Sequence, residues 1–419
     1  MNRAMKDSGI LWIGEIPNDW EYTFLKHYYD FEKGKNAALY TQEYIGNNLG
    51  DYPVYSGQTE NGGVMGRINT YDYDIPECLF TTTVGAKVMT AKVLRGQFSL
   101  SQNCLIMKKI EESSINFFLY ALTALFDYEK SLIPSHMQPS LRIEDLKRYK
   151  LFIPSLTEQL KIAEFLDRKC AEVDEMIGLQ EQIIEELKAY KQSVITEAVT
   201  KGLNPDAPMR DSGIEWIGQI PEHWEVKRIK FIGKAENGLT YTPNDVCDES
   251  EGTLVLRSSN IQDGKLAFND NVYVRSVPDS LKVQVGDIII CSRNGSASLV
   301  GKSALVEEDI DASFGAFMMR FRSSNNSKYI HFLLTATISH YKQLFTTTTI
   351  NQLTIGLINN IAMPFIGDAA EQQAIADYLD EKCADIDSLI QTKLSKIDSL
   401  KEYKKSIIYE YVTGKREVE

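Results

Sequence analysis

The sequence has no long apolar run. Its longest runs, such as residues 287–291 with their Ile-Ile-Ile centre, have the length of a strand, whereas a membrane-spanning helix needs about 20 apolar residues. Residues 1–8 also lack the apolar stretch of a secretory signal. We therefore expect a cytoplasmic chain that does not enter a membrane.

Cysteine and histidine are scarce, and neither is arranged for metal binding. The six cysteines are widely spaced and form no CxxC pair, so the sequence favours reduced thiols over zinc ligands or a disulfide scaffold. The five histidines have no spacing to cysteines or carboxylates that is typical of metal sites. We expect no metal-binding residues in this chain.

Motifs for catalysis are also missing. Methyl transfer to a base needs a cofactor site and a polar-aromatic tetrapeptide, and the sequence contains neither Asn-Pro-Pro-aromatic nor Asp-Pro-Pro-aromatic. It has no glycine-rich loop placed between a parallel strand and a helix, and no phosphate loop of the Walker type. We expect no catalytic and no cofactor-binding residues.

Positive charge is not in excess, because the net charge is −13. The acidity lies outside two long segments, 22–152 and 226–362, whose formal charges are about 0 and +1. Binding to nucleic acid needs Lys and Arg to neutralise phosphates. The charge distribution therefore permits nucleic-acid binding by these two segments without demonstrating it.

What the sequence does contain is a duplication. Residues 5–21 read MKDSGILWIGEIPNDWE and residues 209–225 read MRDSGIEWIGQIPEHWE, so about two thirds of the positions are identical. All four tryptophans lie in these two copies, where we interpret them as packing anchors. A length of 419 residues with 43% hydrophobic and 25% charged residues suits two globular domains.

A second repeat joins residues 158–200 with residues 371–413, which share Glu-Gln near the start and Val-Thr at the end. No proline interrupts either stretch, and apolar residues recur at spacings of three and four, which is typical of a coiled-coil seam. At a rise of about 1.5 Å per residue each helix would be roughly 65 Å long, so the natural partner of each is the other.

Helices related by the duplication should pair antiparallel. Gln180 would then face Lys393 near the middle, whereas Cys170 and Cys383 would lie at opposite ends without a disulfide. The residues expected to pair are Leu166, Val173, Ile177, Gln180, Ile184, Leu187, Leu379, Ile386, Ile390, Lys393, Ile397 and Leu400.

The two segments between the repeats match poorly in sequence but have the same character. Runs of β-branched and aromatic residues are broken by Gly, Asn and Asp, and short helical stretches follow, so each segment reads as an α+β domain. We therefore expect an α+β chain: a first domain over 1–154, a helix over 155–203, a second domain over 204–364 and a helix over 365–416. The pair of helices would form a long antiparallel coiled coil with internal pseudo-twofold symmetry.

Polar loops in both segments carry side chains that can read DNA. Arg suits guanine, Asn and Gln suit adenine, and Ser or Thr can contact either a base or a phosphate. The same residue types are common in solvated turns, so these loops do not decide the function alone. The candidate contacts are Ser56, Gln58, Asn61, Arg67, Thr82, Lys87 and Gln102 in the first segment, and Arg257, Ser259, Asn260, Arg293, Asn294, Ser296, Lys302, Thr348 and Asn351 in the second.

Taken together, these residues resemble one family, the specificity subunits of type I restriction-modification enzymes. Residues 7–21 and 211–225 look like the segment that opens a target-recognition domain, and Ile153-Pro154 through Asp167 is similar to the junction from such a domain into the conserved helix. Pro364 through Asp380 repeats that junction. Residues 286–296 look like a common core strand and loop of the family, from which the counterpart 78–88 departs. The resemblance covers essentially the whole chain.

The resemblance implies a non-catalytic DNA-reading subunit. Each domain would read one half of an asymmetric bipartite sequence in double-stranded DNA, and the helices would set the separation. Two methyltransferase subunits that use S-adenosylmethionine, and restriction subunits that use ATP and magnesium, would complete the complex.

Two other interpretations remain open from the sequence. Paired domains on a coiled coil could bind proteins and have no DNA role. The chain could also be a fused restriction and methylation enzyme whose catalytic part is lost or hidden.

Overall fold

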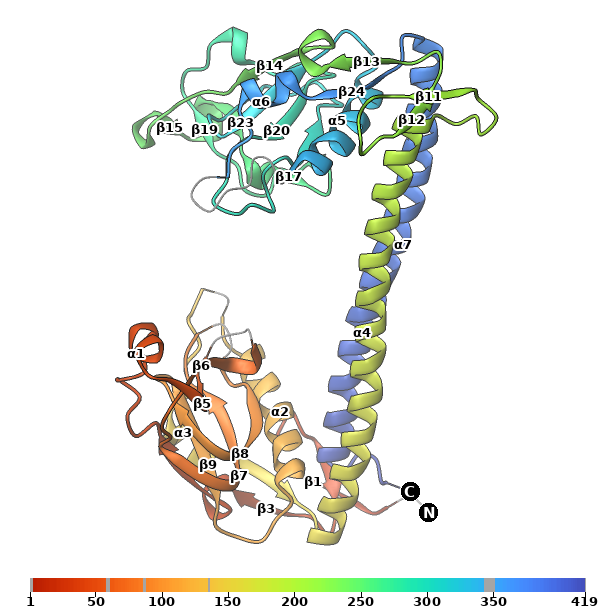
Figure 1. The fold of residues 1–419 in the computed structure, drawn as a ribbon. Helices are drawn as coiled ribbons and strands as arrows, with labels where there is room; N and C mark the ends of the chain where they lie inside the picture. The colour runs from red at the N-terminus through yellow and green to blue at the C-terminus, as the bar shows by residue number, and fades with distance from the viewer. Residues whose placement is uncertain (1–2, 58–60, 86–87, 135, 343–350, 419) are drawn as a thin grey trace. The chain divides into compact units, whose positions relative to one another are not determined.

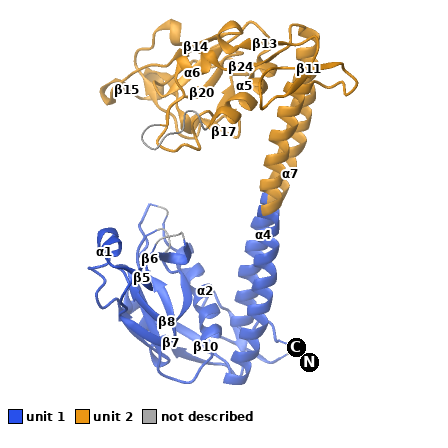
Figure 2. Ribbon diagram, in the orientation of Figure 1, with its two compact units in different colours: residues 1–181, 394–419 blue, residues 182–393 orange. Residues whose placement is uncertain are grey.

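A computed structural model describes residues 3–57, 61–85, 88–134, 136–342 and 351–418. The chain divides into two compact units (Figure 2), one formed by Met1–Glu181 with Leu394–Glu419 and the other by Gln182–Lys393. Each unit contains one copy of the repeated opening segment, one variable segment and a part of both long helices (Figure 1).

The first unit contains a six-stranded sheet in the order β4-β9-β7-β8-β5-β6. Neighbouring strands in this sheet are antiparallel, except that β5 and β8 are parallel. The sheet strands are β4 (Tyr29–Lys33), β5 (Leu49–Tyr55), β6 (Val64–Ile68), β7 (Tyr73–Thr82), β8 (Ala91–Leu100) and β9 (Cys104–Lys109). The other elements are the hairpin β1 (Met5–Asp7) and β2 (Glu15–Pro17), the pair β3 (Glu21–Phe24) and β10 (Lys150–Ile153), and helices α1 (Gln42–Asn47), α2 (Ile115–Ser131) and α3 (Ile143–Arg148).

The second unit repeats this plan with its sheet divided in two, in the orders β14-β23-β20-β21 and β15-β19-β16-β22. The strands of the first sheet are β14 (Lys234–Asn237), β20 (Ile288–Cys291), β21 (Ser303–Leu305) and β23 (Met318–Arg322), and those of the second are β15 (Val246–Cys247), β16 (Thr253–Leu256), β19 (Tyr273–Val274) and β22 (Ala312–Phe314). The other elements are hairpins β11 (Met209–Asp211) with β12 (Gln219–Pro221) and β17 (Ile261–Gln262) with β18 (Lys265–Leu266), the pair β13 (Glu225–Arg228) and β24 (Ala362–Phe365), and helices α5 (Ser327–Tyr341) and α6 (Ile355–Asn360).

The two variable segments share one topology although their sequences match poorly. The order β4-β9-β7-β8 corresponds to β14-β23-β20-β21, and all of these neighbours are antiparallel. The parallel pair β5 and β8 corresponds to the parallel pair β16 and β22. The two domains are therefore variants of one fold.

Each domain core forms where one helix covers the sheet. Helix α2 begins with a side-chain cap on Ser114 and buries Phe117, Phe118 and Leu122. Helix α5 begins with the same kind of cap on Asn326 and buries an equivalent face. An apolar stripe at helical spacing against a sheet supplies the main free energy of folding in such a domain.

The long helices are α4 (Leu156–Lys201) and α7 (Ala369–Val412). In the first unit, the start of α4 shares a core with the end of α7, for example Leu166 with Ile408 and Tyr411. In the second unit, the end of α4 shares a core with the start of α7, for example Val199 with Leu379. The helices therefore pair antiparallel, as the sequence predicted.

All residues predicted to pair are at least half-buried. Those that are fully buried are Leu166, Val173, Ile184, Leu379, Ile386, Ile397 and Leu400, and those that are half-buried are Ile177, Gln180, Leu187, Ile390 and Lys393. Gln180 and Lys393 belong to different units, so their contact stays a prediction. Cys170 and Cys383 lie in separate cores, and both thiols are free.

One ion pair between the helices occurs in both units. Lys191 Nζ lies 2.7 Å from Asp387 Oδ2 in the second unit, and Lys404 Nζ lies 2.7 Å from Asp174 Oδ2 in the first. The two lysines occupy matching positions of the repeat, directly after Tyr190 and Tyr403. The duplicated sequence thus specifies the same helix register twice.

A glutamine near the start of each long helix ties that helix to its domain. The Gln159 side chain accepts from Ser114 N at 3.0 Å and donates to the Pro154 carbonyl at 3.0 Å. The Gln372 side chain accepts from Asn326 N at 3.1 Å and donates to the Ile366 carbonyl at 2.7 Å. Both glutamines are buried, so each satisfies backbone groups that water cannot reach.

The C-terminal end of each long helix contacts one of the opening hairpins: α4 contacts β11–β12, and α7 contacts β1–β2. Lys201 at the end of α4 donates to the Ile217 carbonyl at 2.8 Å, and Lys415 beyond α7 donates to the Glu15 carbonyl at 2.5 Å. Both helices terminate at a glycine with positive φ, which is the usual helix stop. At Gly414 a Cβ would lie 2.4 Å from Pro17 Cδ, so only glycine fits there.

Replacing Gln372 by leucine should destabilise the second unit. The change leaves the Ile366 carbonyl and Asn326 N without a partner and should lower the free energy of unfolding by about 1–3 kcal/mol. Gln391, which is exposed on the same helix, is the control, and Gln391→Leu should stay within about 0.5 kcal/mol. Urea unfolding of the full chain measures both, and equal effects would contradict the role given to Gln372.

Candidate nucleic-acid interface

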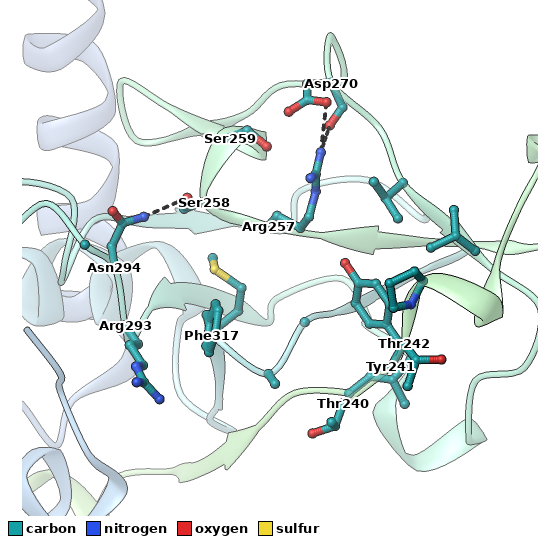
Figure 3. A pocket seen from close by; sticks show the side chains of 18 of the residues that line it. Thr240, Tyr241, Thr242, Arg257, Ser258, Ser259, Asp270, Arg293, Asn294 and Phe317 are labelled. Atoms are coloured by element: carbon teal, nitrogen blue, oxygen red, sulfur yellow. Dashed lines mark hydrogen bonds and ion pairs between the residues drawn. The ribbon is translucent and has the colours of Figure 1, made fainter. Parts of the chain in front are cut away.

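The second domain contains a hollow of about 1090 Å³ at the ends of several strands (Figure 3). Its walls come from the loop after β14, the loop after β16, the loop after β20 and the turn before β23. Five of the predicted contact residues line it: Arg257, Ser259, Arg293, Asn294 and Asn351. The fold thus brings together side chains that lie far apart in the sequence.

The loop after β20 is held on both sides by backbone hydrogen bonds. Ser292 N and Arg293 N donate to the Phe317 carbonyl at 2.9 and 3.1 Å, and Leu353 N donates to the Ser292 carbonyl at 2.8 Å. The Asn294 amide donates to Ser258 Oγ at 3.1 Å and so links this loop to the one after β16. The lining is therefore largely preformed.

Arg293 offers its guanidinium to the solvent. The residue is exposed, and its guanidinium carbon lies 5.3 Å from the centre of the Phe317 ring, within the range of a cation–π contact. In the part of the chain that the structure describes, this guanidinium forms no ion pair or side-chain hydrogen bond. Its N–H donors are therefore available to a ligand.

Arg257 contrasts with Arg293, because its own domain holds its side chain. Arg257 Nη2 donates to the Asp270 carbonyl at 3.0 Å and lies 2.9 Å from Asp270 Oδ1 (Figure 3). This pair neutralises the arginine and occupies its Nη2 donors. Arg257 therefore lines the hollow mainly as part of the wall.

Burial contradicts two of the predicted contacts, Asn260 and Thr82, whose exposed fractions are 0% and 3%. The Asn260 side chain accepts from Arg257 N at 2.9 Å and donates to the Ala267 carbonyl at 3.0 Å, so it organises the loop that follows β16. Thr82 lies at the end of the buried strand β7. Neither side chain has a surface to offer DNA.

The remaining predicted contacts stay predictions. Ser296 is exposed, whereas Lys302 is half-buried and donates to the Ile261 carbonyl at 2.7 Å. In the first domain Asn61, Arg67 and Gln102 are exposed and Ser56 is half-buried. Gln58, Lys87 and Thr348 lie outside the described residues.

The sequence analysis missed two residues beside these loops. Phe317 is 59% exposed although it lies in a run that reads as strand, and its neighbour Met318 is buried. Lys92 in the first domain lies 4.1 Å from the Tyr55 ring centre and donates to the Gly62 carbonyl at 2.5 Å, and burial lowers the pKa of its ammonium. Only tertiary contacts distinguish these residues from ordinary strand positions.

Among the described residues we find neither a metal-binding cluster nor an activated thiol beside the hollow. They contain no group of three or more His, Cys, Asp or Glu side chains that could hold a metal ion. Burial raises the pKa of the Cys291 thiol beside the hollow, so this thiol is not activated as a nucleophile. Among them, no helix is long and apolar enough to cross a membrane.

Replacing Asn260 by alanine should destabilise the second domain rather than alter its ligand contacts. The change leaves Arg257 N and the Ala267 carbonyl unpaired in a buried place and should cost about 2–4 kcal/mol of unfolding free energy. Ser259→Ala, one position earlier and half-buried, is the control and should cost less than about 0.5 kcal/mol. Thermal unfolding measures both, and an Asn260→Ala variant as stable as the control would restore Asn260 as a candidate contact.

Comparison with known proteins agrees with this arrangement. The type I restriction enzyme MjaVIII specificity subunit of Methanocaldococcus jannaschii is 25% identical over 430 residues, covering 96% of this chain and 93% of that protein. The type I restriction enzyme StySPI specificity subunit of Salmonella potsdam is 31% identical over 212 residues, covering 47% of this chain and 44% of that protein.

A solved structure from work on the complex assembly and conformational transition of the type I R-M system has a similar fold. Its TM-score is 0.68 at 15% identity, and the match covers 96% of this chain and 99% of that one. The family model of the type I restriction modification DNA specificity domain matches residues 17–189 and 221–399. This chain, which carries that domain twice, belongs to the family of type I restriction-modification specificity subunits.

Proposed function

We propose that this chain reads an asymmetric, bipartite sequence in double-stranded DNA, with one half assigned to each domain. The observation that carries the proposal is one fold built twice with different loop residues. Two readers of one kind with different contact sets are what two different half-sites require. The comparisons give no support to the protein-binding adaptor.

The paired helices would set the separation of the two half-sites. Helices α4 and α7 are the elements that both units share, and the repeated ion pairs fix their register. A change in the length of these helices would therefore change the number of bases between the two halves. The chain itself is the non-catalytic part, and a DNA target would favour a location in the cytoplasm.

Partner subunits would supply the chemistry. Two methyltransferase subunits, which bind S-adenosylmethionine, would dock on the helices and the opening segments, and restriction subunits would use ATP and magnesium. Large apolar side chains are exposed at matching positions of the repeated helices, namely Met176 with Leu389 and Tyr190 with Tyr403. A single exposed apolar residue needs no explanation, but the recurrence on both copies suits two identical partners.

The near-neutral domains also favour such an assembly. Affinity for DNA comes largely from phosphate neutralisation, and the formal charges of the two variable segments are only about 0 and +1. We therefore expect weak DNA binding by the chain alone and tight binding only when methyltransferase subunits enclose the duplex.

Exchange of the second variable segment tests the function. Replacing residues 226–362 with the matching segment of another specificity subunit should change one half of the methylated sequence and leave the other half unchanged. Mapping of methylated bases across the host genome, with deletion of the gene as the control, measures this. An unchanged sequence after the exchange would favour the adaptor instead.

Substitution of the exposed positions on the helices tests the docking of partners. Met176→Glu and Leu389→Glu should each weaken one methyltransferase site, and together they should abolish the complex, because a carboxylate cannot be buried in an apolar contact without a partner. Met176→Leu serves as the control. Mass measurement of the purified complex counts the bound subunits, and two bound subunits in the double variant would contradict this docking surface.

A further inference from the structure

The two domains place different side chains at one equivalent site. In the first domain Thr83 N donates to the Asn103 carbonyl at 2.8 Å and Leu141 N donates to the Thr83 carbonyl at 2.8 Å. The second domain has the same two hydrogen bonds: Ser292 N donates to the Phe317 carbonyl, and Leu353 N donates to the Ser292 carbonyl. The backbone at this site is therefore the same in both domains.

An isolated strand bridge follows next in each domain and fixes the equivalence of single residues. Val84 bridges to Ser140 in the first domain, and Arg293 bridges to Gln352 in the second. Val84 thus corresponds to Arg293, and Asn103 corresponds to Phe317. The site holds an apolar residue and an amide in one domain, and a cation on an aromatic ring in the other.

The contact with Phe317 prepares Arg293 to recognise a flat ligand edge. The ring lies beneath the guanidinium at 5.3 Å and limits its rotation without using any of its N–H donors. The backbone of Arg293 is fixed by the Phe317 carbonyl at 3.1 Å and by the bridge to Gln352. Less conformational entropy is therefore lost when the guanidinium binds.

The base edge that accepts two parallel hydrogen bonds from a guanidinium is that of guanine, through O6 and N7. We propose that Arg293, supported by Phe317, reads one guanine in the half-site of the second domain. The proposal rests on the proposed function and adds to it a specificity-determining residue and its base. Val84 and Asn103 give the first domain no such reader at the equivalent site.

The alternative for an exposed arginine is a phosphate contact. A lysine can replace an arginine at a phosphate because it keeps the charge. At a guanine edge a lysine can still donate hydrogen bonds, but it lacks the planar fork that stacks on an aromatic ring and matches O6 and N7, so it discriminates less between bases. Arg293→Lys therefore separates the two roles. If Arg293 reads a base, the lysine variant should discriminate less at one position of the target. If Arg293 contacts a phosphate, the lysine variant should recognise the same sequence as the natural chain.

The test uses the full chain together with its methyltransferase subunits in cells that lack their own copy. Methylated bases are mapped for the natural chain, for Arg293→Lys and for Phe317→Leu. We expect Arg293→Lys to relax one G·C position in one half-site only and Phe317→Leu to relax the same position more weakly. Arg275→Lys, an exposed arginine of the same domain outside the hollow, should leave the methylated sequence unchanged.

Binding of the purified complex to duplexes that contain 7-deazaguanine provides the second measurement. Loss of N7 at that position should weaken binding by the natural chain roughly 10- to 100-fold and should have a clearly smaller effect on the Arg293→Lys complex. This measurement decides the case even where a variant no longer methylates.

The two proposals fail in different ways. If no methylated sequence depends on the natural chain, the proposed function is wrong. If such a sequence exists but the half-site contains no G·C pair, or if Arg293→Lys discriminates guanine from 7-deazaguanine as the natural chain does, the assignment of Arg293 is overturned and the function stands.

Discussion

The contact on which each half of this molecule depends is a buried indole bound to a carboxylate at the start of a long helix. Trp20 Nε1 donates to Glu158 Oε2 at 3.3 Å, and Trp224 Nε1 donates to Glu371 Oε1 at 2.9 Å. Both rings are fully buried, so their N–H groups need an acceptor, and the field at a helix N-terminus favours a carboxylate there. The glutamine that follows each glutamate forms hydrogen bonds with backbone groups of the domain. Two consecutive residues therefore join the opening segment, the domain and the helix.

This constraint explains how one fold can carry two different readers. The opening segments and helix starts hold each domain through side-chain contacts, so their residues recur in both copies. The proposed reading site is held instead by backbone hydrogen bonds, from Thr83 N to the Asn103 carbonyl in one domain and from Ser292 N to the Phe317 carbonyl in the other. Because these bonds make no use of side chains, the residues at Val84 and Arg293 are free to differ without any change of fold.

The same distinction explains what the sequence could reveal. The helices, their antiparallel pairing and the α+β domains were predictable, because apolar periodicity and the repeat are local signals. The reading site was not, because its members meet through contacts distant in sequence. Asn260 and Asn294 both lie in polar loops after buried strands, yet Asn260 is buried by residues 267–271 and Asn294 lines the hollow. Phe317 is exposed beside buried Met318, and only the neighbouring loops decide which of the two faces solvent.

The near-neutral charge of the two domains has a consequence for how they would select a DNA sequence. A free cation at a reading surface adds affinity for any phosphate as well as for the right base. In the second domain Asp270 neutralises Arg257, whereas Arg293 rests on an uncharged ring. Among the described residues that line the hollow, Arg293 therefore presents a guanidinium whose donors suit a base edge and are not paired with a carboxylate. If the affinity for DNA comes from partner subunits, the base contacts of this chain add little to binding at other sequences. These contacts can therefore favour the correct base by a large factor.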